Sequence, residues 1–130
     1  MMLEEYISIQ SSSEWIQKVR EILDSVGIRY EAEEAIRIHI DDMVLQISET
    51  EDGGFTIVAS IELSSRPSLQ DIDRIVNVLG KTLRLLSITE RELVYELDTS
   101  LPSYPFLYIS IRYRDLDELL NDLRKIVRNI

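Results

Sequence analysis

Apolar residues recur along the chain with two spacings, one typical of helices and the other of strands. Three stretches follow the helical spacing, which predicts helices at 11–26, 68–86 and 115–130. Five stretches alternate apolar and polar positions, which predicts strands at 36–40, 43–48, 55–63, 93–97 and 107–113. The order helix, three strands, helix, two strands, helix predicts one α+β domain over residues 1–130, with helices packed mainly on one face of an antiparallel sheet.

Short polar residues mark the ends of the predicted helices. The segment 11–14, Ser-Ser-Ser-Glu, has the spacing of a capping box, and Gly27 is the expected stop of the first helix. Ser68 and Asp115 are the expected N-caps of the other two helices, each with an acidic residue three positions later. Residues 1–10 are expected to add a short strand through Tyr6, Ile7 and Ile9.

Two acidic turns between the first three strands hold the strongest candidates for chemistry. Asp41 and Asp42 lie in the first turn, and Glu49, Glu51 and Asp52 lie at the second. Both groups stand where tight turns favour such residues, whereas a glycosidase needs two carboxylates held across a cleft. The second group lacks the spacing of a calcium loop, so no metal is assigned. An enzymatic or small-molecule-binding domain using these carboxylates stays open as an alternative.

The usual signatures of catalysis are missing from the sequence. His39 is the single histidine and falls on the polar phase of its strand, so we expect it to face solvent. The chain has no cysteine, which excludes disulfides and thiolate metal sites. No zinc-protease, P-loop, dinucleotide-binding or serine-hydrolase motif occurs. We therefore expect no enzyme activity, no catalytic residue and no cofactor.

The charge balance limits the partners that the chain can bind. Lys and Arg total 14 against 24 Asp and Glu, a net charge of −10 that repels phosphate backbones and anionic membranes. We expect no nucleic-acid partner and no membrane association. The acidic N-terminus does not resemble a signal peptide, which predicts a cytoplasmic protein. The 11 Arg against 3 Lys and the 18 Ile loosely match a heat-adapted composition.

Two groups of apolar side chains exceed what a one-sided core needs. On the second helix, the row Ile72, Ile75, Val76, Leu79 and Leu83 is predicted to cover the sheet, which leaves a second apolar flank formed by Val78 and Leu85. On the last strand, Phe106 and Tyr108 point away from the face that the helices are expected to cover. We predict a protein interface and a homodimer. The alternatives are that the flank covers the edge of the core and that the aromatics are scattered surface residues.

The element order, the length, the acidic composition and the amphipathic last helix from Leu116 to Ile130 resemble the secretion-chaperone-like fold. This group includes the class I chaperones of type III secretion systems and related bacterial stress-response proteins. The resemblance implies a non-enzymatic homodimer that holds a partner segment in extended form along apolar patches. It further implies a dimer contact on the second helix and the strand after it, which here means Val78, Leu85, Leu93 and Tyr95.

Overall fold

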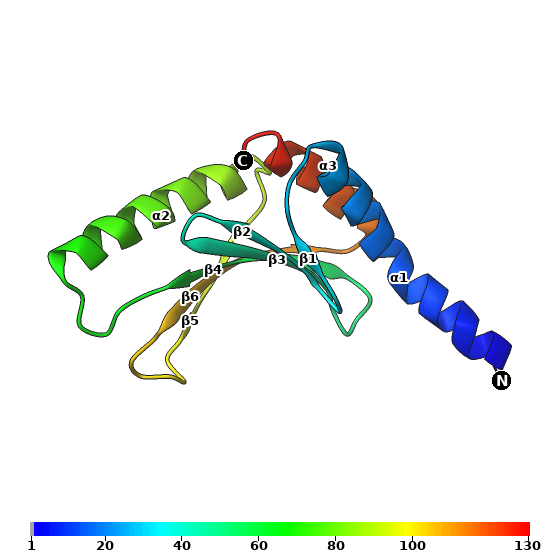
Figure 1. Ribbon diagram of the computed structural model, residues 1–130, viewed down its shortest axis with the longest axis horizontal. Helices are drawn as coiled ribbons and strands as arrows, with labels where there is room; N and C mark the ends of the chain where they lie inside the picture. Colours follow the sequence, from blue (N-terminus) through cyan, green and yellow to red (C-terminus); the bar gives the residue numbers. More distant parts are fainter. Residues whose placement is uncertain (1) are drawn as a thin grey trace.

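The computed structural model describes the backbone of residues 2–130 and the side chains from residue 14 onward. Three helices and six strands follow one another along the chain (Figure 1). Their bounds are α1 (Met2–Ser25), β1 (Glu31–Ala32), β2 (Ile36–Ile40), β3 (Met43–Glu49), β4 (Phe55–Glu62), α2 (Leu69–Ser87), β5 (Val94–Asp98), β6 (Phe106–Tyr113) and α3 (Leu116–Val127).

The six strands form one antiparallel sheet in the order β1-β2-β3-β4-β6-β5. The predicted meander is confirmed, because β3 pairs with both β2 and β4, and β2 and β3 are joined through the turn at Asp41 and Asp42. The predicted pairing of the last two strands is also confirmed, with Tyr95 opposite Ile109. The last strand of the chain, β6, lies between β4 and β5, so β5 is at an edge of the sheet. The two-residue β1 was not predicted.

The core lies between the sheet and the helices, which lie on the same side of it, while the N-terminal half of α1 extends beyond the sheet (Figure 1). Alternate residues of each central strand point into it, as the period of a strand requires. The fully buried strand residues are Ile36, Ile38, Leu45, Ile47, Ile57, Ala59, Ile61, Ile109 and Ile111. α1 packs against α3 and contributes Trp15, whose ring meets that of Phe55 edge-on with centroids 5.7 Å apart. The predicted α+β class is thereby confirmed.

The helix caps match the sequence in two of three cases. Ser68 and Asp71 form a full capping box at the start of α2, and the Asp115 side chain accepts a hydrogen bond from the Glu118 N–H at the start of α3. The prediction for the N-terminus is wrong, because α1 begins at Met2 and runs through the serines without a strand before it. Residues 2–5 are mostly good helix formers, and they let the helix continue past the expected cap.

The prediction for the flanks of α2 is wrong in part. Leu79 and Leu83 of the predicted row do pack against the core, but the other flank is buried as well. Val78 and Leu85 face the core and are only 5% and 9% exposed, whereas Ile72 and Val76 are 44% and 64% exposed. The buried hydroxyl of Thr82 donates a hydrogen bond to the Val78 carbonyl oxygen at 2.7 Å, so this row can enter the core without an unpaired polar group. Val78 and Leu85 are therefore core residues and do not form an outward-facing interface.

Gly54 allows a close approach between β4 and β6. A Cβ atom added there would lie 2.6 Å from the carbonyl oxygen of Tyr113, which is a backbone atom that cannot move aside. We predict that Gly54→Ala lowers the free energy of unfolding by about 1–3 kcal/mol, as overpacking does in other cores. Urea denaturation followed by circular dichroism measures the loss. A Gly54→Ala protein as stable as the wild type would show that the strands separate at no cost.

Candidate protein interface

One exposed flank of α2 is apolar and lies beside the exposed charges of Asp73 and Arg84. Ile72, Val76, Gly80 and Leu83 follow one another at intervals of four, four and three residues, which places them on one side of the helix. Leu69 extends this row and is 82% exposed. We call these five residues the outward row; Leu83, at its end, is half-buried and also packs against the core. No charged side chain interrupts it, and a soluble helix normally carries its charges on the side away from the core.

Gly80 is a second unusual feature of the outward row. Apart from its chain neighbours and the backbone of its own helix, no heavy atom lies within 4 Å of where its Cβ would be, so the described structure gives no steric reason for a glycine. Gly80 is not among the glycines with positive φ either. Glycine inside a helix costs about 1 kcal/mol relative to alanine. A glycine at this position would be useful if another polypeptide chain packed closely against α2, because no side chain would keep the two backbones apart.

The edge strand β5 adds further uncovered apolar surface. Tyr95 and Leu97 lie on the helix-bearing face of the sheet because they pair with Ile109 and Leu107, yet they are 57% and 59% exposed. Leu93, just before the strand, is half-buried against the core. Of the predicted interface residues, Leu93 and Tyr95 therefore lie on the same side of the sheet as α2.

The two predicted aromatics lie on the opposite, open face of the sheet, as expected. The rings of Phe106 and Tyr108 are stacked, with centroids 6.1 Å apart and planes inclined by 6°. The Tyr108 hydroxyl lies 3.5 Å from an oxygen of Asp98, and partial burial together with that carboxylate raises the pKa of Tyr108. Both rings are half-buried, so they form a small apolar patch beside β5.

The candidate carboxylates do not come together in one site. Asp41 and Asp42 precede β3, whereas Glu49, Glu51 and Asp52 lie at its far end. Hydrogen bonds from the Thr50 side chain and the Gly54 N–H lower the pKa of Asp52, which suits a turn residue better than a general acid. No group of three or more potential metal ligands gathers among the described side chains.

His39 lies where the alternation of β2 predicted it. Its side chain is exposed on the open face of the sheet, and its Nε2 lies 3.5 Å from a carboxylate oxygen of Glu31 in β1. No second histidine is present in the chain. The contact is a surface pair between neighbouring strands, which contributes little to stability.

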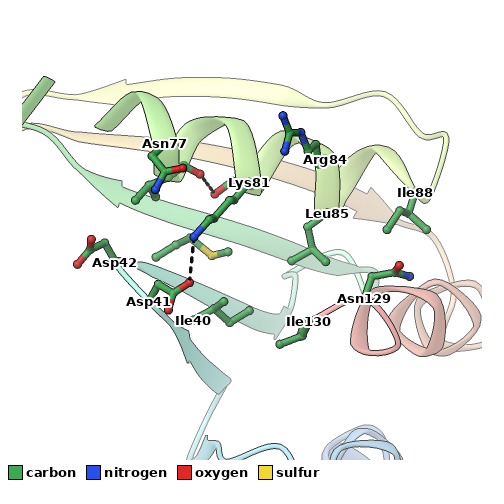
Figure 2. Close-up of a pocket in the computed structure, with 13 residues that line it drawn as sticks. Ile40, Asp41, Asp42, Asn77, Lys81, Arg84, Leu85, Ile88, Asn129 and Ile130 are labelled. Carbon is green, nitrogen blue, oxygen red and sulfur yellow. Dashed lines mark hydrogen bonds and ion pairs between the residues drawn. The ribbon is translucent and has the colours of Figure 1, made fainter. Parts of the chain in front are cut away.

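A cavity of about 410 Å³ lies between α2 and the β2–β3 turn (Figure 2). Its floor is apolar and includes Met43, Val78 and Leu85. Lys81 reaches down from α2 toward the turn, and its Nζ lies 3.7 Å from an oxygen of Asp41 (Figure 2). Sequence reasoning missed this cavity because its walls come from three distant segments of the chain.

Among the described side chains, one carboxylate is buried in the core, that of Asp122, and sequence reasoning also missed it. It is 2% exposed, accepts a hydrogen bond from the Tyr113 hydroxyl at 2.9 Å, and is paired with Arg91. The Arg91 guanidinium also lies over the Tyr113 ring, 4.8 Å from its centroid. Burial, followed by the hydrogen bond to Asp122, raises the pKa of Tyr113. The signal in the sequence was an acidic residue at the edge of the apolar row of the last helix.

These contacts fix the segment between α2 and β5 to α3, because Arg91 follows α2 and Asp122 belongs to α3. In this cluster of Arg91, Tyr113 and Asp122, the polar groups bond to one another. It therefore acts as a structural element that holds the start of β5 in place.

We predict that Asp122→Ala lowers the free energy of unfolding by about 2–3 kcal/mol, because the Tyr113 hydroxyl and the Arg91 guanidinium lose their partner. The neighbouring exposed residue provides the control, since Asn121→Ala should change stability by less than about 0.5 kcal/mol. Chemical denaturation of both variants measures the difference. Equal stabilities would show that water replaces the carboxylate without cost.

Comparison with known proteins supports the fold. No protein-family model and no curated protein matches the chain. Among solved structures, it is similar to the crystal structure of YbjN from E. coli, a proposed transcription regulator, with a TM-score of 0.52 and 16% sequence identity. The likeness covers 88% of this chain and 84% of that chain. None of the described helices is both long and apolar enough for a membrane span. At this identity, the likeness to YbjN shows a shared α+β fold.

Proposed function

We propose that this chain is a non-enzymatic protein-binding module, chaperone-like or regulatory, that acts as a homodimer. The observation that carries the proposal is the outward row of α2, in which Leu69, Ile72 and Val76 are 82%, 44% and 64% exposed. Contiguous exposed apolar surface on a soluble domain marks an interaction site more often than isolated apolar residues do. The likeness to YbjN, a proposed regulator, is compatible with this function.

Two features of the outward row favour a second copy of the chain as its partner. A two-fold contact buries each residue of the row twice, and full burial of a Val, Leu or Ile side chain contributes about 1.5–3 kcal/mol. Gly80, within the row, would let two helices approach closely. The net charge of −10 on each copy opposes association, so the contact has to be apolar at its centre.

The charges beside the outward row are also self-complementary. Asp73 and Arg84 are both exposed on α2, and neither belongs to an ion pair among the described residues. They lie on the same side of the row, near its two ends. In an antiparallel two-fold packing of α2 on its copy, Asp73 of one copy faces Arg84 of the other at both ends of the contact. The arrangement favours the antiparallel orientation over the parallel one.

We predict that the wild type is a dimer and that Ile72→Asp combined with Val76→Asp yields a folded monomer, because unpaired charges at a buried contact are strongly unfavourable. The matched control carries the same change on the other flank, where Val78→Asp with Leu85→Asp should unfold the domain. Light scattering gives the mass and circular dichroism the fold. A monomeric wild type, or a dimer that survives the outward double substitution, would remove the dimer claim.

The cavity beside Asp41 and Asp42 favours a second candidate function, the binding of a small molecule. Its volume of about 410 Å³ lies in the range of ligand sites, and an apolar floor with a polar rim is typical of them. Of the five turn carboxylates, this cavity is lined by Asp41 and Asp42 alone. This second candidate function therefore uses Asp41 and Asp42, without Glu49, Glu51 or Asp52.

Native mass spectrometry tests this candidate. We predict that a small molecule bound by the wild type is lost from Ile130→Trp, whose larger side chain would fill the cavity from its rim, and is kept by Arg128→Trp, which does not line it. A wild-type mass that matches the bare chain would contradict ligand binding under the conditions of purification.

A further inference from the structure

The edge strand β5 offers a backbone that another chain could pair with. Within the part of the chain that the structure describes, β6 alone pairs with β5. The opposite edge, β1, has two residues, whereas β5 has five. An edge strand exposes unpaired N–H and C=O groups, and natural proteins shorten, charge or cover such edges to prevent aggregation. The length and uncovered apolar side of β5 make it the available edge of this sheet.

The two sides of β5 differ in chemistry. Tyr95 and Leu97 point to the helix-bearing side and are more than half exposed. Glu96 and Asp98 point to the open side, where they lie opposite Tyr108 and Phe106 of β6. A strand added to this edge would therefore meet Tyr95 and Leu97 on one side. On the other side it would meet Val94 at one end, followed by the two carboxylates.

These carboxylates oppose pairing of β5 with its own copy. Antiparallel pairing of β5 with its own copy keeps the apolar sides together when it is centred on Tyr95, Glu96 or Leu97. Each of these registers places two carboxylates opposite one another. The acidic pairs are Glu92 with Asp98 when the centre is Tyr95, Glu96 with its own copy when it is Glu96, and Glu96 with Asp98 when it is Leu97. Like charges directly opposite one another on a sheet are destabilising. The edge therefore favours a basic partner over a second copy.

We propose that β5 accepts an extended segment of another protein, with alternating apolar and basic residues, as a seventh strand of the sheet. The apolar residues of that segment pack beside Tyr95 and Leu97, and its Lys or Arg residues lie beside Glu96 and Asp98. Backbone hydrogen bonds supply affinity and the side chains supply specificity, as in other cases of strand addition. This inference deepens the proposed protein-binding function and does not require the dimer.

The probe is a synthetic eight-residue peptide of alternating Val and Lys, compared with three control peptides. One has the same composition in two blocks, one alternates Val and Glu, and one carries methyl groups on alternate backbone nitrogens. Fluorescence anisotropy measures binding, and hydrogen exchange with mass spectrometry locates it. We expect the Val-Lys peptide alone to bind and to slow exchange in 94–98. Equal binding of the block or methylated peptide would overturn strand addition, because neither can form the alternating ladder.

Charge reversal on β5 provides the matched test on the protein. Glu96→Lys with Asp98→Lys should weaken the Val-Lys peptide about tenfold and allow the Val-Glu peptide to bind. Glu33→Lys with Glu34→Lys makes the same change of net charge away from β5 and should alter binding far less. If both variants lost the same affinity for the Val-Lys peptide, net charge alone would explain the effect, and β5 would not be the binding site. If the wild type is a dimer but binds none of the peptides, strand addition is wrong and the proposed dimer is unaffected.

Discussion

The antiparallel pairing of β4 with β6 is the contact on which the rest of this structure depends. It joins residues about fifty positions apart, from Phe55 opposite Tyr113 to Glu62 opposite Phe106. Such a pairing closes a long loop, whose entropy cost has to be recovered by the packing that follows. Fully buried Ile57, Ala59, Ile109 and Ile111 meet across it and supply that packing. Gly54 permits it at one end, where any side chain would collide with β6.

The insertion of β6 beside β4 also decides which surfaces stay uncovered. Because β6 occupies the place next to β4, β5 lies at the edge of the sheet. The cluster of Asp122, Tyr113 and Arg91 then fixes the start of that edge to α3. α2 connects the two halves of the sheet and is apolar both toward the core and away from it. The exposed edge at β5 is therefore a consequence of the topology, whereas the outward row depends on which residues the exposed side of α2 carries.

Local patterns in the sequence predicted the elements well, because each depends on neighbouring residues. The caps at Ser68 and Asp115, the turn at Asp41 and Asp42, and the stop at Gly27 are set by short-range hydrogen bonds and backbone preferences. The same reasoning failed at the N-terminus, where a serine-rich capping signal lies inside a helix. A capping signal shows where a helix is able to start, and favourable residues before it can still extend the helix.

Tertiary features were less accessible from the sequence. On α2, two apolar flanks have similar composition, and only the sheet shows that the row with Val78 and Leu85 faces inward. The cavity beside Asp41 needs three distant segments, so no local pattern contains it. Phe106 and Tyr108 were placed on the correct face because the period of a strand fixes the alternation once the covered face is known.

The two proposed surfaces are compatible with one another. A dimer through the outward row uses one side of α2, while an added strand uses the backbone of β5, so one assembly can have both. The dimer would present two acidic edges, related by two-fold symmetry. Such a pair of edges would hold two segments of one partner more tightly than either edge alone.

The measurement that tests the central claim most directly is a distance between two copies of α2. The natural chain has no cysteine, so a single Asp73→Cys variant can be spin-labelled at one defined position beside the outward row. Double electron–electron resonance then reports the separation between labels in solution. Antiparallel packing through the outward row predicts one narrow distance, shorter than that from a label at Arg37 on the open face of the sheet. Absence of dipolar coupling at position 73, or a shorter distance from position 37, would contradict it.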